Sequence, residues 1–339
     1  MKYSSIVNNM VHAWTCDPTL PIYLEGPPGI GKTSIAFSVA ADMGMDPRPH
    51  KDGGDVVIFR PSLRDPCDLL GIPDNRGEYT RWKPPYELAC LQDQPMLLVI
   101  DEMPQAEKMM QNALAGLMLD RFVGELGLHP GVRVMATGNR TKDKAGANRV
   151  VSQLGNRVMK VEQHPDLDDW CNWAVDQPGL DIMGVAYMRF AGIGALFDFD
   201  PDRFSNATPR SWERVMRQDY KIYDPADFYE SVSGLVNEGR AAEYVGFRNL
   251  LGKVPNIDQI VMDPTGAMVS DEPDVNYACV ANLITRATEQ NFGALCNYVS
   301  RLKKDYQVLF MKGALRSNGK LMDTREFIMW SIHNQAVFM

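Results

Sequence analysis

The chain has 339 residues, with 35 Lys and Arg against 43 Asp and Glu, and a formal net charge of −8. Hydrophobic residues make up 45% of it and charged residues 23%, a composition typical of folded globular proteins that excludes an intrinsically disordered chain. The apolar runs are far shorter than the roughly 18 residues of a membrane span, and no signal-peptide core follows the N-terminus. We therefore expect a cytoplasmic protein without a membrane span. The acidic balance argues against an extended nucleic-acid surface.

Short apolar runs in the first half of the chain predict β-strands, and helical patterns separate them. The runs lie at residues 21–25, 56–60, 97–100, 132–136 and 157–161. Strands that alternate with helices are typical of a parallel sheet with crossover connections. We therefore expect an α/β domain over residues 1–164.

From residue 165 onward, helical spacing replaces the strand pattern. The predicted helices lie at 166–175, 208–218, 227–237, 239–250, 275–287, 291–306 and 324–334. The last one begins Asp323-Thr324-Arg325-Glu326, which predicts a capping box. The segment 255–274 is rich in Asp, Pro and Gly and predicts a loop. We expect a helical lid over residues 165–250 and a helical C-terminal extension of unknown role over residues 251–339.

The strongest motif follows the first predicted strand and fits the pattern G-x-x-x-x-G-K-[ST]. It consists of Gly26, Pro27, Pro28, Gly29, Ile30, Gly31, Lys32 and Thr33, with Ser34 in the helix that follows. The glycines let successive backbone N–H groups face one phosphate, and the helix N-terminus adds a favourable dipole. Lys32 can reach the β- and γ-phosphates, and the Thr33 hydroxyl can ligate Mg²⁺. The motif predicts a nucleoside triphosphate site; ATP is the expected nucleotide, and GTP stays open.

Two carboxylates, Asp101 and Glu102, follow the apolar strand at 97–100. A carboxylate at a strand tip beside the phosphate loop can hold Mg²⁺, which is the role expected of Asp101. Glu102 can orient and polarise the attacking water. A third apolar run ends in Thr137-Gly138-Asn139, where the Asn139 amide could bond the γ-phosphate or the water. The alternative for Asn139 is an ordinary turn residue.

The order of these motifs resembles that of the AAA+ ATPases, which are P-loop NTPases with a three-layer parallel sheet and a helical lid. Within that family the chain resembles the MoxR branch, which includes the NorQ and CbbQ activators and is related to the dynein-like group. The resemblance covers roughly residues 5–250. It implies a homo-oligomeric ring, expected to be a hexamer, that hydrolyses ATP to remodel or activate a protein partner. For the MoxR branch, the implied partner carries a von Willebrand A-type domain.

The resemblance also assigns roles to single residues. Lys32 and Thr33 match the Walker A positions, Asp101 and Glu102 match the Walker B pair, and Asn139 matches the sensor-1 position. These matches imply the same chemistry that the residues suggest by themselves.

Three arginines receive roles from the resemblance. Arg157 matches the arginine finger that reaches the neighbouring subunit's nucleotide, although the family usually has Arg-Phe where this chain has Arg-Val. Arg149 is a hypothetical second interface arginine. Arg210 matches the sensor-2 arginine of the lid, on a helix that Thr208 is expected to cap and Pro209 to begin.

Two insertions, at residues 68–82 and 120–131, predict hairpins. They resemble loops that line the central pore in assemblies of the MoxR branch, so Arg76, Tyr79 and Arg121 are candidates for contact with a partner. The alternative is that both are plain surface hairpins.

Two other functions stay open. One is a nucleic-acid motor or loader, similar to McrB or to helicase loaders, for which Arg76, Arg81, Lys83 and Arg121 offer basic side chains; the overall acidity does not favour it. The other is a nucleotide-dependent binding switch with low turnover, against which the intact Asp101-Glu102 pair argues.

Overall fold

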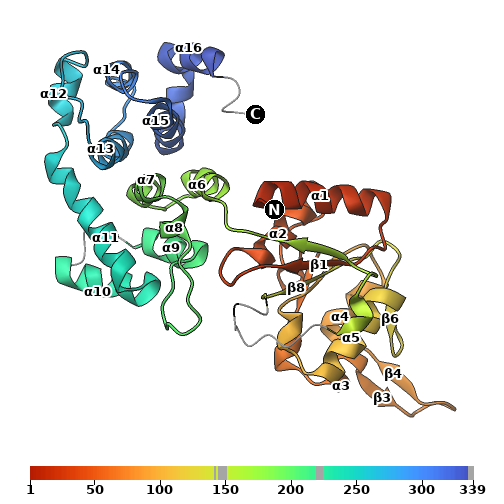
Figure 1. The fold of residues 1–339 in the computed structure, drawn as a ribbon. Coiled ribbons are helices and arrows are strands. Elements are labelled where there is room, and N and C mark those ends of the chain that lie inside the picture. The colour runs from red at the N-terminus through yellow and green to blue at the C-terminus, as the bar shows by residue number, and fades with distance from the viewer. Residues whose placement is uncertain (141–142, 144–150, 219–223, 335–339) are drawn as a thin grey trace. The chain divides into compact units, whose positions relative to one another are not determined.

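The computed structural model describes residues 1–140, 143, 151–218 and 224–334 (Figure 1). The chain divides into two compact units, Met1–His164 and Pro165–Met339. We call the first the sheet unit and the second the helical unit. Among the helices of the described residues, none combines the length and the apolar character that crossing a bilayer requires.

The sheet unit is built on five parallel strands in the order β2-β5-β8-β1-β9. Their bounds are β1 (Ile22–Glu25), β2 (Val56–Phe59), β5 (Leu97–Ile100), β8 (Arg133–Gly138) and β9 (Met159–Glu162). The predicted parallel sheet is confirmed, with all five strands within one or two residues of their expected ends. Because β8 lies between β1 and β5, the ends of these three strands meet at one edge of the sheet.

Side chains alternate between the two faces of the sheet, and helices cover both faces. Leu97 and Val99 belong to a cluster with α1 and α2, whereas Leu98 and Ile100 belong to a second cluster with α5. This period-two alternation of apolar residues is what a strand buried on both faces requires. The unit therefore has three layers. Its helices are α1 (Tyr3–Cys16), α2 (Lys32–Asp42), α3 (Pro66–Leu70), α4 (Tyr86–Ala89) and α5 (Lys108–Asp120).

Both predicted hairpins are present in the sheet unit. In one, β3 (Ile72–Asp74) pairs antiparallel with β4 (Arg81–Lys83), and this hairpin projects from the rest of the unit (Figure 1). In the other, β6 (Phe122–Val123) pairs with β7 (Leu126–Gly127). Whether either contacts a partner stays a prediction.

The helical unit contains short helices that share one core. They are α6 (Leu167–Asp176), α7 (Ile182–Ala191), α8 (Ile193–Leu196), α9 (Pro209–Met216), α10 (Pro225–Val236), α11 (Glu238–Asn249), α12 (Ile257–Met262), α13 (Pro273–Thr285), α14 (Phe292–Val299), α15 (Lys304–Ser317) and α16 (Arg325–His333). Buried side chains from Trp170 to Leu321 form a single hydrophobic cluster. Helices on both sides of residue 250 contribute to it, so the later helices pack as part of the same unit.

One predicted helix is wrong. The helix expected over 291–306 is two helices, α14 and α15, separated at residues 300–303, and the second runs on to Ser317. The break places Leu302 in the core, where it is 7% exposed. The free energy gained by burying Leu302 outweighs that of continuing one helix through residues 300–303. No Gly or Pro marks the break in the sequence.

Two local predictions near the C-terminus also need correction. The capping box expected at Asp323 is wrong, because Asp323 ends a 3-10 turn. The N-cap of α16 is the next residue, Thr324, whose side chain accepts from the Phe327 N–H. The segment 255–274, predicted as a loop, contains α12, whose first turn is capped by the Asn256 side chain. The Asn256 cap offsets the poor helix composition of its surroundings.

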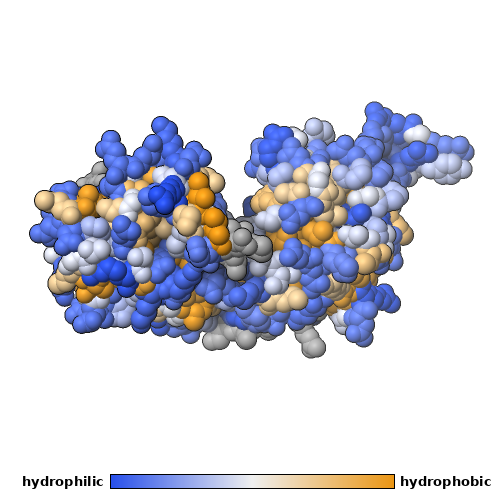
Figure 2. Space-filling view, turned by 90° about the horizontal axis from the view of Figure 1, so that it is seen from above, coloured by the Kyte–Doolittle hydropathy of each residue, from blue (hydrophilic) through white to orange (hydrophobic). Residues whose placement is uncertain are grey.

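The face drawn in Figure 2 is mainly hydrophilic, with separate apolar patches. Exposed aromatic side chains of the sheet unit include Tyr79 and Tyr86, at 75% and 92% exposure, in and beside the β3–β4 hairpin. In the helical unit, Phe204 is fully exposed. Isolated exposed apolar side chains are common on folded proteins and do not by themselves mark a binding site.

Candidate functional site

The phosphate loop lies between the end of β1 and the start of α2. Gly29 and Gly31 have φ values of 73° and 89°, in the left-handed region that glycine adopts without strain. A Cβ atom on Gly26 would lie 2.8 Å from Ile30 Cδ1 and 3.0 Å from the Gln163 carbonyl oxygen. The tight path of the loop therefore requires glycine at all three positions of the motif.

Lys32 is the first residue of α2 and is only 8% exposed. Its Nζ donates to the carbonyl oxygens of Gly26 and Pro27, at 3.0 and 2.8 Å, and to Asn139 Oδ1 at 2.7 Å. Asn139 lies 107 residues further along the chain and is brought here because β8 is the neighbour of β1. The ammonium group is thus held in the loop and joined to the tip of the adjacent strand.

Asp101 sits at the end of β5 with its side chain 8% exposed. Its Oδ1 accepts from Thr33 Oγ1 at 2.9 Å and from Thr137 Oγ1 at 2.8 Å. Its Oδ2 pairs with Arg60 Nε at 3.4 Å. The carboxylate therefore links the first turn of α2 to the ends of β8 and β2.

Glu102 follows directly and has φ 57° and ψ 39°, a left-handed conformation that is unusual for a residue with a side chain. Its backbone N–H donates to Thr137 Oγ1 at 3.0 Å. One threonine hydroxyl thus fixes both acidic residues, since it donates to Asp101 and accepts from Glu102. A strained backbone conformation that its surroundings hold in place is common at functional sites.

Close packing behind the strand tip makes Gly138 necessary. A Cβ atom there would lie 2.1 Å from the Tyr23 hydroxyl oxygen and 2.7 Å from Pro104 Cγ. Burial raises the pKa of Tyr23, and its hydroxyl is buried without a hydrogen-bond partner among the described residues. The absence of a side chain at residue 138 lets the backbone of β8 lie directly against Tyr23 before it turns into Asn139.

The donor set at Thr33 and Asp101 suits Mg²⁺. The hydroxyl and the carboxylate are hard oxygen ligands that already lie 2.9 Å apart, and Mg²⁺ commonly takes one or two such protein ligands together with phosphates and water. The described residues contain no cluster of three or more His, Cys, Asp or Glu side chains that would hold a metal by themselves. The arrangement therefore fits a metal that arrives with a phosphate.

The structure thus brings together five predicted site residues at one edge of the sheet: Lys32, Thr33, Asp101, Glu102 and Asn139. Two further residues of this site, Thr137 and Arg60, received no role from the sequence. The signal for both was available, because each is a polar residue at the carboxyl end of a predicted strand.

Arg157 is exposed and lies two residues before β9. Its N–H donates to the carbonyl oxygen of Leu154, which is 3% exposed and anchors the turn. Residues 152–156 line an open hollow of about 870 Å³. The exposure of Arg157 suits contact with another molecule, and its role as a finger stays a prediction. Arg149 lies outside the described residues.

Arg210 is exposed on α9, in the helical unit. The predicted start of this helix is confirmed, with Pro209 as its first residue and Thr208 as its cap. Thr208 Oγ1 accepts from the Ser211 N–H at 3.2 Å, and Ser211 Oγ accepts from the Thr208 N–H at 2.8 Å. The cap fixes the helix that carries Arg210, whose predicted role over the nucleotide stays a prediction.

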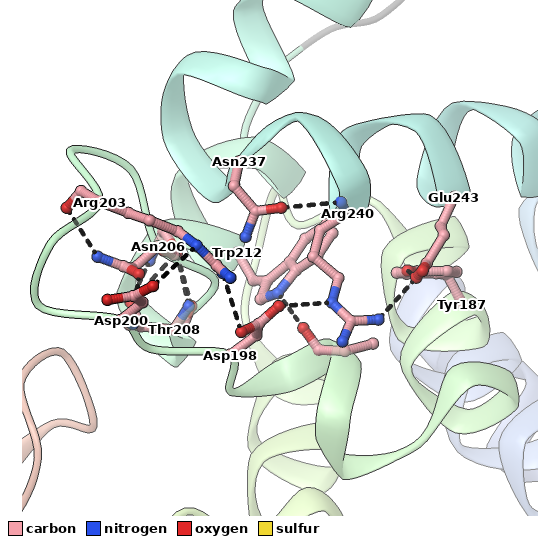
Figure 3. A network of polar contacts seen from close by, with 12 residues as sticks. Tyr187, Asp198, Asp200, Arg203, Asn206, Thr208, Trp212, Asn237, Arg240 and Glu243 are labelled. Atoms are coloured by element: carbon pink, nitrogen blue, oxygen red, sulfur yellow. Dashed lines mark hydrogen bonds and ion pairs between the residues drawn. The ribbon is translucent and has the colours of Figure 1, made fainter.

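A polar network in the helical unit holds the loop that leads into α9 (Figure 3). Asp198 pairs with Arg203 at 3.1 Å and with Arg240 at 3.3 Å. Arg240 also pairs with Glu243 at 2.8 Å, and the Tyr187 hydroxyl donates to the same carboxylate at 2.9 Å. Arg203 also pairs with Asp200 at 3.4 Å, so each charged side chain of the network has a partner of opposite charge within it. We therefore assign the network to the stability of the unit.

No family model matches the chain. Similar solved structures include a mutant RuvB of Thermotoga maritima, at 14% identity and a TM-score of 0.40, with 75% of each chain covered. NtrX from Brucella abortus in complex with ADP is similar at 13% identity and a TM-score of 0.42, over 99% of this chain and 68% of that one. NtrX in complex with ATP is similar at 12% identity and a TM-score of 0.41, over 100% and 69%. Similarities this low carry no inference about function. The predicted fold class, a three-layer parallel sheet with a phosphate loop followed by helices, is confirmed by the strand order and the helical content.

Proposed function

We propose that this chain is a MoxR-like AAA+ ATPase, which binds ATP and Mg²⁺ at the phosphate loop and works as a homo-oligomeric ring, expected to be a hexamer. Hydrolysis would serve to remodel or activate a protein partner. The observation that supports the proposal is the cluster described above, in which Lys32 bonds Asn139 while Thr33 and Thr137 both bond Asp101.

Lys32 would neutralise the β- and γ-phosphate oxygens. Its ammonium group is held by the carbonyl oxygens of Gly26 and Pro27, so it is positioned before the nucleotide arrives. Through its contact with Lys32, the Asn139 amide would lie beside the γ-phosphate. Positioned charges and dipoles of this kind supply most of the catalysis in phosphoryl transfer.

Thr33 and Asp101 would hold the metal. When bound, Mg²⁺ supplies positive charge that offsets the charge of the phosphate oxygens. The Thr137 hydroxyl, which donates to Asp101, keeps the carboxylate oriented toward Thr33.

Glu102 would accept a proton from the attacking water. The water oxygen forms a bond to the γ-phosphorus while the bond to the β–γ bridging oxygen breaks, and the proton moves to the Glu102 carboxylate. The left-handed backbone at Glu102, fixed by Thr137, sets the direction in which that carboxylate leaves the strand.

Arg157 would complete the site of a neighbouring subunit, and Arg210 would act from the lid. Both guanidinium groups would stabilise the charge of the transition state. Because a monomer would lack the finger, the proposal requires a ring for full activity.

The partner is expected to be a protein with a von Willebrand A-type domain, by resemblance alone. The alternative of a nucleic-acid motor draws support from the β3–β4 hairpin, where Arg81 and Tyr79 are exposed. In the same hairpin, Arg76 and Lys83 both pair with Asp74, which lowers the charge available for phosphates. Stimulation of ATP hydrolysis by DNA that falls steeply with salt would favour the nucleic-acid motor.

The test compares Glu102→Gln and Lys32→Ala with Glu107→Gln, a control at an exposed glutamate five residues after Glu102. We expect Glu102→Gln to keep ATP binding and to lose about 10²–10⁴-fold in turnover, because only the base is removed. We expect Lys32→Ala to lose ATP binding and Glu107→Gln to behave as wild type. Equal turnover in Glu102→Gln and wild type would overturn the assigned base, and wild-type binding of ATP without hydrolysis would favour the binding switch. ATP-bound Glu102→Gln is also the form in which to capture the partner.

A further inference from the structure

Arg60 is the residue directly after β2, beside the tip of β5. The two tips are held in register, because the Asp101 N–H donates to the Phe59 carbonyl oxygen at 2.8 Å. The Arg60 side chain is 61% exposed, whereas the Asp101 carboxylate that it contacts is 8% exposed. A largely solvated guanidinium group thus reaches a nearly buried carboxylate.

The two oxygens of Asp101 have different partners. Oδ1 accepts two hydroxyl hydrogen bonds, from Thr33 and Thr137. Oδ2 pairs with the guanidinium of Arg60, with Nε at 3.4 Å. Oδ1, which we call the inner oxygen, is therefore fixed by neutral groups. Oδ2, which we call the outer oxygen, lies beside a positive charge.

A guanidinium group and Mg²⁺ cannot both approach the same carboxylate oxygen closely without repulsion between like charges. The contact of Arg60 is long and made by an exposed side chain, so it is a weak ion pair that a divalent cation can displace. Arg60 can then turn into solvent, while the Thr33 and Thr137 bonds to the inner oxygen remain.

We propose that Arg60 is a positioning residue that occupies the outer oxygen of Asp101 in the absence of metal and competes with Mg²⁺ for it. Arg60 thereby sets the Mg²⁺ concentration at which the nucleotide is bound. This inference rests on the proposed function, since it requires Asp101 to be a ligand of the metal that accompanies ATP.

The neighbouring Arg64 provides a matched control. It lies four residues further along, pairs with Glu87 at 2.8 Å, and lies over the Phe59 ring at 5.7 Å. It carries the same charge on the same segment, and its partner is a different carboxylate. The Arg64 variant therefore also removes one positive charge from this segment, and it leaves the ion pair between Arg60 and Asp101 in place.

The experiment measures binding of a fluorescent, non-hydrolysable ATP analogue as Mg²⁺ is titrated, and binding of the same analogue in EDTA. For Arg60→Gln and for Arg60→Met, a second variant of similar length, we expect the Mg²⁺ midpoint to fall about three- to tenfold, because one competing charge is gone. Arg60→Lys keeps a positive charge on a shorter side chain, so we expect its Mg²⁺ midpoint to lie between those of these variants and that of wild type. Binding in EDTA measures the metal-independent affinity of each variant, so that the Mg²⁺ midpoint can be compared with it. The thermal unfolding midpoint is expected to stay unchanged in all of them, and Arg64→Gln is expected to match wild type in every measurement.

Equal Mg²⁺ midpoints in wild type, Arg60→Gln and Arg60→Met would overturn the inference and leave the proposed function standing. A fall of the same size in Arg64→Gln would also overturn it, because the effect would then be general electrostatics. Failure of the wild-type chain to bind the analogue at any Mg²⁺ concentration would overturn the proposed function itself.

Discussion

Two carboxylates, one in each unit, show how differently this chain treats acidic groups that are largely removed from water. In the sheet unit, Asp101 receives two hydroxyl hydrogen bonds and one loosely held guanidinium. In the helical unit, Asp181 contacts Arg248, which is 8% exposed and lies over the ring of Phe228. The charge of Asp181 is cancelled within the fold, whereas that of Asp101 stays available to a cation. A carboxylate held by neutral donors is therefore a better sign of a binding site than one in a closed ion pair.

The two units also differ in net charge. Residues 1–164 contain 18 Lys and Arg against 19 Asp and Glu, whereas residues 165–339 contain 17 against 24. Most of the net acidity thus belongs to the helical unit. The overall charge argues against a nucleic-acid surface on that unit and says little about the sheet unit, which carries both hairpins.

The largest effect of a single substitution is expected in the sheet unit, on ATP turnover, at Arg157. If its guanidinium completes a neighbour's site, Arg157→Ala loses about 10³–10⁵-fold in ATP turnover while ATP binding stays unchanged. The measurement is steady-state hydrolysis beside nucleotide titration. Arg48→Gln serves as the control, because Arg48 is an exposed arginine of the same unit that pairs with Asp46.

Mixing separates action between subunits from action within one. Arg157→Ala keeps an intact base, and Glu102→Gln keeps an intact finger, so an equal mixture that assembles at random is expected to recover about a quarter of wild-type turnover in a ring with head-to-tail contacts. A mixture as inactive as its two components would contradict action in trans, as would full activity of a monomeric Arg157→Ala protein.

In the helical unit, the expected effect is on stability. Arg248→Met leaves Asp181 without its counter-charge and is expected to cost about 3 kcal/mol of unfolding free energy. The double variant Arg248→Met with Asp181→Asn removes both charges and is expected to recover part of that loss. Urea unfolding measures both, and ATP affinity measured on the folded protein is expected to stay at the wild-type value.

In the sheet unit, the variant to compare with Arg248→Met is Asp101→Asn. It is expected to weaken Mg²⁺-dependent nucleotide binding with little change in unfolding free energy. Should Arg248→Met unfold at the same urea concentration as wild type, the closed pair would contribute nothing to the fold. The contrast between the two carboxylates would then lose its basis.

How far the sequence predicts the site depends on whether its parts are contiguous. The phosphate loop could be recognised because Gly26 to Thr33 form one unbroken motif, and Asp101 and Glu102 because they follow a strongly apolar strand. The contacts of Thr137 and Arg60 depend on which strands are neighbours. Nothing in the order of the strands along the chain states that β8 lies between β1 and β5 or that β2 lies beside β5.

The same distinction holds for the fold. Parallel strands followed by helices could be predicted from local periodicity, and the observed strands confirm it. The break between α14 and α15 could not, because it depends on the burial of Leu302 by helices that are distant in sequence. Long-range packing overrides local helix preference there.

A smaller effect is expected from close packing behind the site. Gly138→Ala forces a methyl group against the Tyr23 hydroxyl and Pro104, and is expected to cost about 2 kcal/mol of unfolding free energy through overpacking. Tyr23→Phe removes the hydroxyl and is expected to restore part of that loss in the double variant. Chemical unfolding of the single and double variants tests the coupling.

The matched control is Gly116→Ala in α5, where a Cβ would meet nothing within 4 Å. Alanine is the better helix former, so we expect this variant to gain about 0.5–1 kcal/mol. Equal unfolding free energies for Gly138→Ala and wild type would show that the strand tip can shift, and that its tight path is not required.

The smallest expected effect compares two helix caps within the helical unit. Thr208 begins a reciprocal capping box with Ser211. The Thr324 hydroxyl accepts a long capping bond of 3.4 Å from the Phe327 N–H and donates to the Leu321 carbonyl oxygen at 2.6 Å. Thr208→Ala is therefore expected to cost about 1 kcal/mol of unfolding free energy, and Thr324→Ala less. Thermal unfolding measures both, and Thr208→Ser is expected to retain the stability of wild type. Because only Thr208 caps the helix that carries Arg210, a fall in ATP turnover confined to Thr208→Ala would support a role for α9 in the site, and an equal fall in Thr324→Ala would contradict it.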